Sequence, residues 1–525
     1  MQSTCVRHTE LPHTAKLFAD YLYQFDRVAR FYAHDPYDPD SFRKAAAGVR
    51  FPPERRSQLV SVLREQNGPS AALDELAREG TVAVVTGQQV GLFSGPCYTI
   101  YKALTAARLA RTLTESGVPA VPVFWLATED HDLEEINHCW VFNAANEPVK
   151  LEVKGANGGR RPVGEIVLDH VPIHALHQAL ADLPFAEETV AMVAEAYAPG
   201  VTLGAAFATL LKRILASQGL LFIDPMHPAS RRLAAPLLAD AVRMAPELTS
   251  SVLERNQELT AAGYHVQVHV EAQTSLVFLL ENGQRLPLRR DGNEYVTNGR
   301  RFSAGDLAGR AEDLSPNALL RPVVQDSILP TVAYVGGPAE LAYLAQSQVL
   351  YHKLLGRMPV AVSRQSATLV DGRASRLMDR YELALPDFFH GEDAVREKMA
   401  RKLVPPELER TLGGARVQAG ELLDRLERAL GDFEPTLANA FKKSRRKVEY
   451  QLAKTERKAA REALRRDQRA AADAAYLCGL VFPEKHLQER LYSIVPFLAR
   501  HGTGLIDRLA DGLSLECRDH RVVVV

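Results

Sequence analysis

The sequence is poor in cysteine and has no excess of charge of either sign. Its 525 residues include only five cysteines, which are scattered along the chain without a CxxC pair. That pattern argues against a disulfide framework and against a structural zinc site. With 63 basic and 64 acidic residues, the formal net charge of -1 gives the chain as a whole no electrostatic basis for binding nucleic acid or an anionic membrane. Any basic surface must be local.

Long apolar runs are absent as well. No stretch approaches the roughly 18 residues that a membrane span requires, and residues 1–22 contain no apolar segment typical of a secretion signal. We therefore expect a cytoplasmic protein with no membrane partner. The length predicts two to four structural units, and a content of 46% hydrophobic and 24% charged residues is typical of a soluble globular chain.

What the chain does contain is an alternation of short apolar runs with helical patterns. Apolar strands are predicted at 81–87, 118–128, 220–225 and 358–366, and the same pattern occurs at 328–346. Near-continuous apolar strands separated by helices predict a parallel sheet that is covered on both faces. The fold class is therefore α/β, with a doubly wound parallel sheet.

Two interruptions and a change of pattern divide the chain. The predicted core and its N-terminal helices occupy 1–139, 204–261 and 326–370. Two insertions lie at 140–203 and 262–325, and the second is β-rich, with hairpin turns at 291–292 and 298–299. A coiled-coil hairpin is predicted at 371–475, followed by a helical tail at 476–525 that ends in a strand-like run.

The coiled coil is predicted from a heptad pattern and a second long helix. The two helices are joined by the turn sequence GDFEP at 431–435, and the second is expected to run to about 475. Such a seam can be satisfied within one hairpin or by a homodimer. Its residues follow spacings that alternate between four and three: Leu408, Leu412, Ala415, Ala419, Leu422, Leu426 and Ala429.

Four strand-to-helix junctions carry polar groups, at 86–96, 127–132, 224–228 and 334–340. Ligands of open parallel sheets bind where the carboxyl ends of the strands meet the following helices, so we expect these junctions to face one crevice. In the first junction, Gln88 and Gln89 offer donors and acceptors, and Gly91 allows close backbone approach. The stretch has no Walker A pattern, and a simple glycine-rich connection explains it equally well.

The second junction reads ATEDHDLEEIN and gathers acids around one histidine. A helix start explains Glu134 and Glu135, because acids stabilise the positive end of a helix dipole. Three readings stay open for the residues before them: a helix start, a metal site, or a pocket for a polar substrate. The candidates for substrate handling are Glu129, Asp130, His131, Asp132 and Asn137. A carboxylate could hold an ammonium group, and His131 could transfer a proton.

The last junction, YVGGPAE, has the features of a helix start. Gly337 is expected at the cap and Glu340 in the first turn, with Pro338 between them. The backbone amides of Gly336 and Gly337 could hold a carboxylate or a phosphate, and Tyr334 and Glu340 complete this predicted binding set. A capped helix without a ligand is an equally good reading.

Two further features were weighed. Cys97 is predicted in the first turn of a helix, where the pKa of a thiol falls, but the five cysteines are read as packing residues. The run 442–469 contains twelve basic residues against four acids. A solvated helix face explains it, and the alternative is an anion site for a nucleotide phosphate or RNA. Its candidate residues are Lys442, Lys443, Arg445 and Arg446.

The motifs TGQQVGLFSGPCYTIYKA, PVFWLATEDHDLEEIN and DSILPTVAYVGGPAELAYLAQ resemble the cysteine ligases of bacillithiol biosynthesis, the BshC family. The resemblance covers essentially the whole chain. It implies a Rossmann-type core with two connecting-peptide insertions, similar to class I aminoacyl-tRNA synthetases, and a coiled coil that serves in dimerisation. Neither an HxGH motif nor a KMSKS-like loop is present, so adenylate formation does not carry over from the synthetases.

The family reaction implied by the resemblance joins L-cysteine to glucosaminyl malate. An amide forms between the cysteine carboxyl and the glucosamine amine and yields bacillithiol, the last step of the pathway. Amide formation from a free carboxylate is uphill in water, so ATP or another activating donor is expected. On this reading Asp130 holds an ammonium group, and His131 orients or deprotonates the attacking amine.

Two other hypotheses belong to different classes. A non-catalytic coiled-coil protein would bind RNA or a nucleotide through its basic hairpin, and its synthetase-like core would have no catalytic activity. A metal-dependent hydrolase would use Asp130, His131 and Asp132 as ligands. The balanced net charge and the polar crevice favour the ligase, for which no metal and no nucleic-acid partner are expected.

Overall fold

The computed structural model of the chain describes residues 2–153 and 159–525. At its centre lies a five-stranded sheet in the order β13-β12-β2-β3-β6, in which all neighbouring strands are parallel. Its strands are β2 (Val82–Gln89), β3 (Ala120–Ala127), β6 (Leu221–Ile223), β12 (Thr331–Gly336) and β13 (Val360–Ser363). The parallel sheet predicted from the apolar runs is confirmed.

Neighbouring side chains of β2 point to opposite faces of this sheet, and helices bury both faces. Val82 and Val84 share a core cluster with residues of α2 and α5, whereas Ala83 and Val85 share one with residues of α3, α10 and α14. The helices around the sheet are α1 (Lys16–Tyr23), α2 (Pro39–Ala47), α3 (Pro53–Asn67), α4 (Ala71–Ala77), α5 (Tyr98–Glu115), α9 (Leu203–Ile214), α10 (Pro228–Arg243), α11 (Ala245–Ala261), α13 (Arg321–Ile328) and α14 (Pro338–Leu355).

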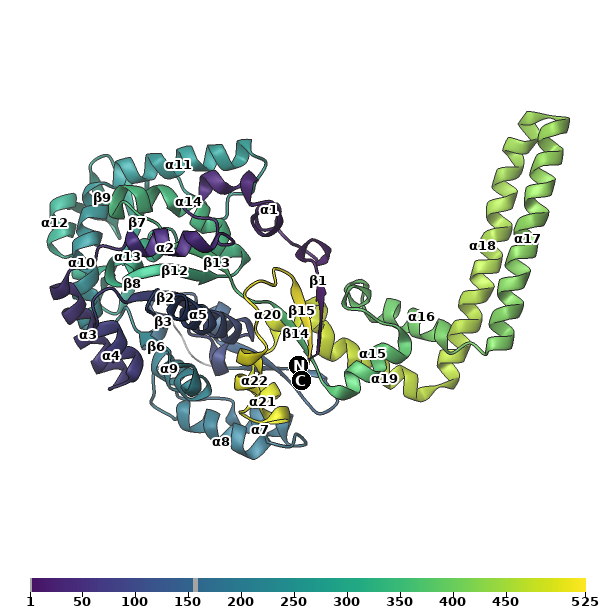
Figure 1. Ribbon diagram of the computed structural model, residues 1–525, viewed down its shortest axis with the longest axis horizontal. Helices are drawn as coiled ribbons and strands as arrows, with labels where there is room; N and C mark the ends of the chain where they lie inside the picture. Colours follow the sequence, from purple (N-terminus) through teal and green to yellow (C-terminus); the bar gives the residue numbers. More distant parts are fainter. Residues whose placement is uncertain (1, 154–158) are drawn as a thin grey trace.

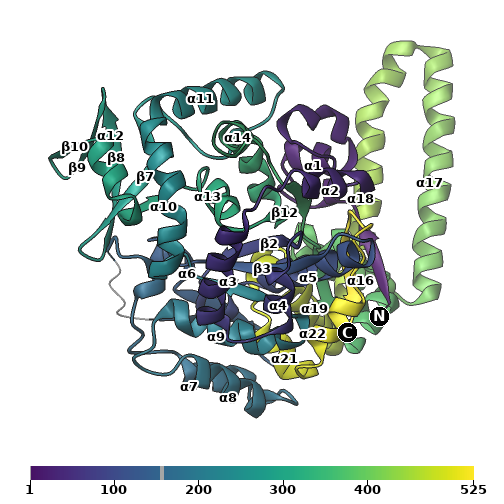
Figure 2. The same cartoon turned by 60° about the vertical axis from the view of Figure 1, so that its left-hand side comes forward.

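Two groups of elements interrupt this core (Figure 2). After β3 come α6 (Leu133–Ile136), the hairpin of β4 (His138–Phe142) and β5 (Pro148–Glu152), and helices α7 (Ile173–Leu180) and α8 (Ala186–Ala196). Between α11 and α13 lies a second, antiparallel sheet, in the order β10-β9-β8-β7-β11. Its elements are β7 (Thr274–Glu281), β8 (Gln284–Asp291), β9 (Glu294–Thr297), β10 (Arg300–Ser303), α12 (Ala304–Gly309) and β11 (Leu314–Pro316).

The predicted hairpins of the second insertion are present at both turn positions. Asn298 and Gly299 both have positive φ, 46° and 75°, as the tight turn between β9 and β10 requires. The β-structure of this insertion begins later than predicted, since residues 265–273 form no strand and β7 begins at Thr274. That segment instead contacts the core through Gln346, which bonds both the amide and the carbonyl of Val268.

A third, three-stranded sheet joins distant parts of the chain. β1 (Ser3–Val6) pairs antiparallel with β15 (His520–Val524), and β15 pairs in parallel with β14 (Ala367–Val370). The two chain ends therefore lie close together, as Figure 1 shows. The strand-like end of the tail was expected, but its partner at residues 3–6 was not.

The C-terminal region is helical, and two of its helices form a long hairpin that projects from the rest of the molecule (Figure 1). Its helices are α15 (Gly372–Tyr381), α16 (Glu392–Lys402), α17 (Pro406–Phe433), α18 (Pro435–Arg466), α19 (Gln468–Val481), α20 (Gln488–Leu491), α21 (Val495–His501) and α22 (Leu505–Asp511). No helix in the part of the chain that the structure describes combines the length and apolarity needed to cross a bilayer.

Two details of the predicted coiled coil are wrong. The second helix does not run to about 475, because Asp467 ends α18 and its side chain accepts a bond from the amide of Ala470, which starts α19. The predicted seam is also only partly internal. Leu423 is buried in the hairpin, whereas Leu422 and Leu426 are 51% and 43% exposed, because a two-helix hairpin covers only one face of each helix.

Candidate active site

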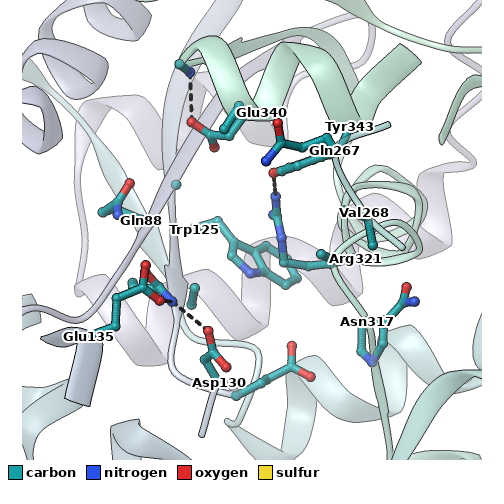
Figure 3. Close-up of a pocket in the computed structure, with 18 of the residues that line it drawn as sticks. Gln88, Trp125, Asp130, Glu135, Gln267, Val268, Asn317, Arg321, Glu340 and Tyr343 are labelled. Carbon is teal, nitrogen blue, oxygen red and sulfur yellow. Dashed lines mark hydrogen bonds between the residues drawn. The ribbon is translucent and has the colours of Figure 1, made fainter. Parts of the chain in front are cut away.

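A cavity of about 660 Å³ lies at the carboxyl ends of β2, β3 and β12. Figure 3 shows its side chains converging from several elements: Gln88 from β2, Trp125 from β3, Asp130 from the turn after β3, Glu135 from α6, and Glu340 and Tyr343 from α14. Arg321, at the start of α13, closes another side. This is the edge at which open parallel sheets bind ligands.

Three of the four predicted junctions meet at this cavity. The fourth, at 224–228, does not line it; there, Asp224 accepts a 2.5 Å hydrogen bond from Thr128 and so supports the turn after β3 from behind. The predicted residues that line the cavity are Gln88, Gln89, Glu129, Asp130, His131, Gly337 and Glu340.

Five predicted residues lie outside this cavity. Asp132 caps α6 by accepting a bond from the amide of Glu135, and Asn137 contacts the ring of His138. Tyr334 is fully buried and donates to Glu340 over 2.6 Å, and Gly336 lies behind it at the end of β12. Gly91 lines a separate, neighbouring cavity.

Asp130 is held as a carboxylate by its neighbours. Burial alone would raise its pKa, but bonds from the Gln89 side chain (2.7 Å) and from the His131 amide (2.7 Å), with the charge of Arg285, hold the pKa below its usual value. Gln89 also donates to Glu135 over 2.9 Å. The predicted proximity of Gln89 and Asp130 is thus a direct contact.

His131 is fixed in one tautomer by Arg285. The guanidinium lies 3.1 Å from Nδ1 and can only donate, so Nδ1 accepts and the neutral ring carries its proton on Nε2. Burial and the charge of Arg285 both lower the pKa of His131, which keeps the ring neutral at pH 7. With Nδ1 occupied, His131 is placed to donate a hydrogen bond rather than to remove a proton.

Glu129 is the most enclosed acid of the cluster. Its carboxylate accepts a 2.6 Å bond from Ser315 of β11, and burial raises its pKa despite the nearby charge of Arg285. The second insertion therefore reaches under the acid cluster through Ser315 and Arg285. A helix start does not explain this carboxyl, because it lies before α6 and points to β11.

Lys102 and Glu340 form a buried ion pair beside β2. Lys102 also donates to the carbonyl of Gly87 (2.9 Å) and to the side chain of Gln88 (2.8 Å). Burial would raise the pKa of Glu340, but Lys102 and the hydroxyl of Tyr334 hold it below its usual value. Because Glu340 also accepts from the amide of Gly337 over 2.8 Å, that predicted anion-binding amide is already occupied.

Arg321 differs from Arg285 and Arg364 of the same cavity wall, which pair with Asp130 and Glu489. It donates to the hydroxyls of Tyr343 (2.7 Å) and Tyr334 (3.2 Å) and to Gln325 (3.2 Å). Among residues 2–153 and 159–525, no carboxylate forms an ion pair with it. Figure 3 shows the side chain between Tyr343 and Trp125. An unneutralised guanidinium in a pocket is a receptor for a carboxylate or phosphate.

Sequence reasoning missed the cations of this site. Lys102 carried one signal, since it interrupts an otherwise apolar face of the helix 98–115. Arg285 and Arg321 follow no local pattern: Arg285 reaches the cavity from β8 of the second insertion, and Arg321 from the start of α13, which follows that insertion. The basic candidates Lys442, Lys443, Arg445 and Arg446 lie on α18, away from the cavity, and Arg445 pairs with Asp424, Glu427 and Glu449.

The remaining candidates do not contribute reactive groups to the cavity. Cys97 is fully buried, and burial raises the pKa of its thiol, so the lowered pKa of a helix start does not apply. Within the described residues, no group of three or more histidine, cysteine or acidic side chains is arranged to hold a metal ion.

A Rossmann-like sheet with a charged cavity at the ends of its strands defines a protein that binds small polar molecules. Two family models divide the chain between them: the BshC N-terminal Rossmann-like domain of bacillithiol biosynthesis matches residues 1–365, and the BshC C-terminal coiled-coil domain matches 367–525. The chain therefore belongs to the BshC family, and the resemblance noted in its motifs is confirmed.

Relatives match the chain over nearly its whole length. A protein of Solibacter usitatus named "Putative cysteine ligase BshC" is 57% identical over 525 residues and covers 100% of both chains. Proteins with the same name from Koribacter versatilis and Salinibacter ruber are 37% and 32% identical. The first alignment covers 99% of each chain, and the second covers 97% of this chain and 96% of the relative.

Proposed function

We propose that the protein is a ligase that joins the carboxyl group of L-cysteine to the amine of glucosaminyl malate and forms bacillithiol in the last step of that pathway. Membership of the BshC family and the name that its relatives carry support this activity. The substrates and the place in the pathway rest on the family resemblance together with the charges of the cavity.

The single observation that carries the proposal is the presence of opposite charges in one cavity. Arg321 offers a guanidinium that forms no ion pair within the described residues, and Asp130 offers a carboxylate whose lowered pKa keeps it charged. Cysteine carries a carboxylate and an ammonium group. A site with one receptor for each can bind and orient such a molecule.

The other side chains have roles that follow from their contacts. His131 donates from Nε2 and can stabilise the negative charge that develops on the carboxyl oxygen when the amine attacks. In that step the amine nitrogen bonds to the carboxyl carbon, the activating group leaves with its electron pair, and the nitrogen loses a proton. Lys102 and Glu340 hold β2 and α14 in place around the substrates.

An activating donor is part of the proposal, because the free carboxylate of cysteine does not form an amide in water. ATP is the donor that we infer from the ligase class. The walls of the cavity include several cationic side chains, and such side chains suit a phosphate group. The basic residues of α18 are the second place at which a nucleotide could bind, through Lys442, Lys443 and Arg446.

The test is a mass-spectrometric assay in which the purified protein receives glucosaminyl malate, cysteine and ATP, and each component is left out in turn. We expect bacillithiol only in the complete mixture, with AMP or ADP beside it. The variants Asp130→Asn and His131→Ala should lower turnover at least tenfold. His227→Ala serves as the matched control, since this histidine lines neither cavity. Unchanged turnover in both test variants would refute the assigned roles.

We also propose that the protein forms a homodimer through the α17–α18 hairpin. Several apolar side chains of the hairpin face solvent, and Phe433 at its tip is 82% exposed. Exposed apolar surface of this kind is typical of an interface. The others are Leu408, Val417, Leu422, Leu426, Leu437 and Val448.

Light scattering after size-exclusion chromatography tests the dimer. The double substitution Leu422→Glu/Leu426→Glu should convert a dimer to a monomer. Arg428→Glu is the control and should leave the dimer intact, because this exposed position lies two residues, or about 200° around the helix, from Leu426. A wild-type protein that is monomeric at micromolar concentration contradicts this part of the proposal.

A further inference from the structure

A second cavity, of about 440 Å³, lies beside the first. The two cavities share the side chains that separate them. The rest of the second wall comes from the loop 91–96, from β4 and from residues 484–491 of the C-terminal region. The residues that line both cavities are Gln88, Gln89, Tyr98, Glu135 and Arg490.

Arg490 is the most informative of these shared residues. Its guanidinium forms no hydrogen bond and no ion pair with any residue in 2–153 or 159–525. His486 and His138 add two further groups that can bind an anion, while Glu484 and Glu135 are the acids on this wall. An unpaired guanidinium between two cavities can bind a carboxylate in either of them.

The wall of the second cavity also contains an aromatic side chain and two glycines. Trp140, half-buried on β4, contributes a broad apolar surface with a polar edge. Gly91 and Gly95 also line this cavity, and a Cβ atom on Gly91 would lie only 3.0 Å from the Cα of Gly95, so a side chain there would crowd the loop. A cavity with an aromatic side chain and a few polar groups is typical of a site for a polar organic ligand.

The segment that carries Arg490 is held rigidly. The neighbouring Glu489 is buried and accepts two bonds from Arg364, at 2.8 and 2.9 Å, and Gln488 bonds the backbone amide and carbonyl of Leu369. Before it, Glu484 and Lys485 adopt φ values of 48° and 61°, which L-residues rarely adopt. The wall is thus pre-organised rather than a loose surface loop.

We propose that this second cavity binds the acceptor substrate, an amino sugar linked to a dicarboxylic acid. The sugar ring lies against Trp140, a carboxylate binds Arg490, and the amine lies at Gln88 and Gln89, which line the cysteine cavity as well. The inference rests on the proposed ligase function. It assigns the two reactants to two cavities and makes the C-terminal region a part of the substrate site.

The first cavity is the larger of the two, at about 660 Å³ against about 440 Å³, and on this assignment it holds both cysteine and the activating group. Cysteine has one carboxylate and few atoms, and the first cavity already offers it a receptor for each charge. The acceptor carries two carboxylates and a sugar ring, which fit a 440 Å³ space with an unpaired arginine and two histidines. Binding of the acceptor there leaves the first cavity free for cysteine and the activating group.

The experiment measures binding of glucosaminyl malate by calorimetry, and KM for each substrate, in the full-length protein. Arg490→Gln should weaken binding of glucosaminyl malate about tenfold or more, as expected for the loss of a charged hydrogen bond. His486→Gln should weaken it less, and KM for cysteine should stay within about twofold of the wild type. Lys485→Gln is the matched control, because it removes a neighbouring exposed charge that lines neither cavity.

A second ligand shows whether Arg490→Gln removes a contact with a carboxylate or disturbs the whole site. For an amino sugar without the malyl group, the wild type and Arg490→Gln should bind equally. If Arg490→Gln and His486→Gln bind glucosaminyl malate as tightly as the wild type, or if only KM for cysteine rises, the second cavity is not the acceptor site, and the ligase function stands. If the wild type neither binds nor converts glucosaminyl malate, the proposed function fails and this inference fails with it.

Discussion

Four of the five lysine and arginine side chains that line the two cavities fall into two groups, those that pair with a carboxylate and those that do not. Lys102 pairs with Glu340, and Arg364 pairs with Glu489. Arg321 and Arg490 form no ion pair within the residues that the structure describes. Because a paired, buried charge is already satisfied, the first two hold the architecture together. The other two are available to anionic groups of the substrates.

Arg321→Gln tests this distinction directly. Loss of a charged hydrogen bond costs about 1.5–3 kcal/mol, so KM for cysteine should rise about tenfold to a hundredfold. Arg321→Lys keeps the charge but loses the planar geometry, and we expect an intermediate value. Steady-state kinetics with cysteine as the varied substrate measure the effect. An unchanged KM in Arg321→Gln would show that no substrate carboxylate binds there.

Substitutions of Lys102 and Glu340 should instead change the stability of the protein, because the two side chains form a buried ion pair. Lys102→Met leaves the buried carboxylate of Glu340 without its partner and should lower the free energy of unfolding by about 3 kcal/mol or more. The double variant Lys102→Met/Glu340→Gln removes both charges and should be more stable than Lys102→Met alone. Urea denaturation followed by circular dichroism compares the two. Equal stability would mean that the pair contributes little net energy.

Among the cavity residues, those at the ends of strands were predicted from the sequence, and those contributed by other parts of the chain were missed. Gln88, Gln89 and Asp130 were predicted because each follows an apolar strand, and the ends of parallel strands must lie together. Arg285 comes from the second insertion and Arg321 begins α13 directly after it, so the position of both depends on how that insertion packs on the core. Local spacing carries no information about that placement.

Among the elements, the first insertion is locked against the end of β3 by two glycines. A Cβ atom on Gly164 would lie 2.4 Å from the Cβ of Thr128, and one on Gly204 would lie 2.8 Å from the carbonyl oxygen of Gly164. The amide of Gly164 also donates to the carbonyl of Thr128 over 3.0 Å. Thr128 precedes Glu129 and Asp130, so this contact positions the acid cluster.

Gly164→Ala should therefore disturb both stability and activity. Overpacking of this kind costs about 1–3 kcal/mol, and a displaced Thr128 moves the carboxylates out of position, so we expect a clear fall in kcat. Thermal unfolding and the ligase assay measure the two effects. Gly309→Ala, on α12, is the control, because a Cβ atom there would meet nothing within 4 Å. A fully active, stable Gly164→Ala protein would contradict the role of this contact.

The elements themselves were more predictable than their surroundings. The strands of the core and the hairpin of α17 and α18 were predicted from period and length. The inward face of α17 was not, because the leucines of the hairpin fit more than one seam and the sequence does not say which one meets α18. Leu423, outside the predicted heptad set, is the leucine that is buried.

On the scale of the whole molecule, one polar cluster joins the C-terminal region to the core. His520 of β15 is fully buried, and its two ring nitrogens contact Ser366 (2.6 Å) and Thr368 (2.8 Å). Glu489, Arg364 and the ring of His8 surround it. Burial lowers the pKa of His520 to about 4, because the charged ring would lose its hydration there.

This cluster makes the fold sensitive to acid. Since the pKa of His520 is lower in the folded state than the ordinary 6.5, the unfolded chain binds the proton more tightly. Stability is therefore complete above about pH 6.5 and falls as the pH drops towards 4. Between pH 7 and 5 the loss from this residue should be about 2 kcal/mol.

Urea denaturation at pH 7, 6 and 5 measures the effect. His520→Gln should show a smaller loss over this range than the wild type, whatever its stability at pH 7. His227→Gln, a substitution of a partly exposed histidine, should keep the wild-type difference. If the wild type and His520→Gln lose equal amounts, His520 is not the group responsible.

The three-stranded sheet of β1, β14 and β15 has a consequence for how the chain is made. Ser3 pairs with Val523, so β1 finds its partner only after more than 500 further residues have been synthesised. β15 is the central strand, and β1 and β14 cannot pair until it arrives. The Rossmann-like core can fold while synthesis continues, but residues 3–6 stay an unpaired strand throughout. Contacts this distant in sequence form slowly. Closure of this sheet is therefore expected to be a late event in the biogenesis of the protein.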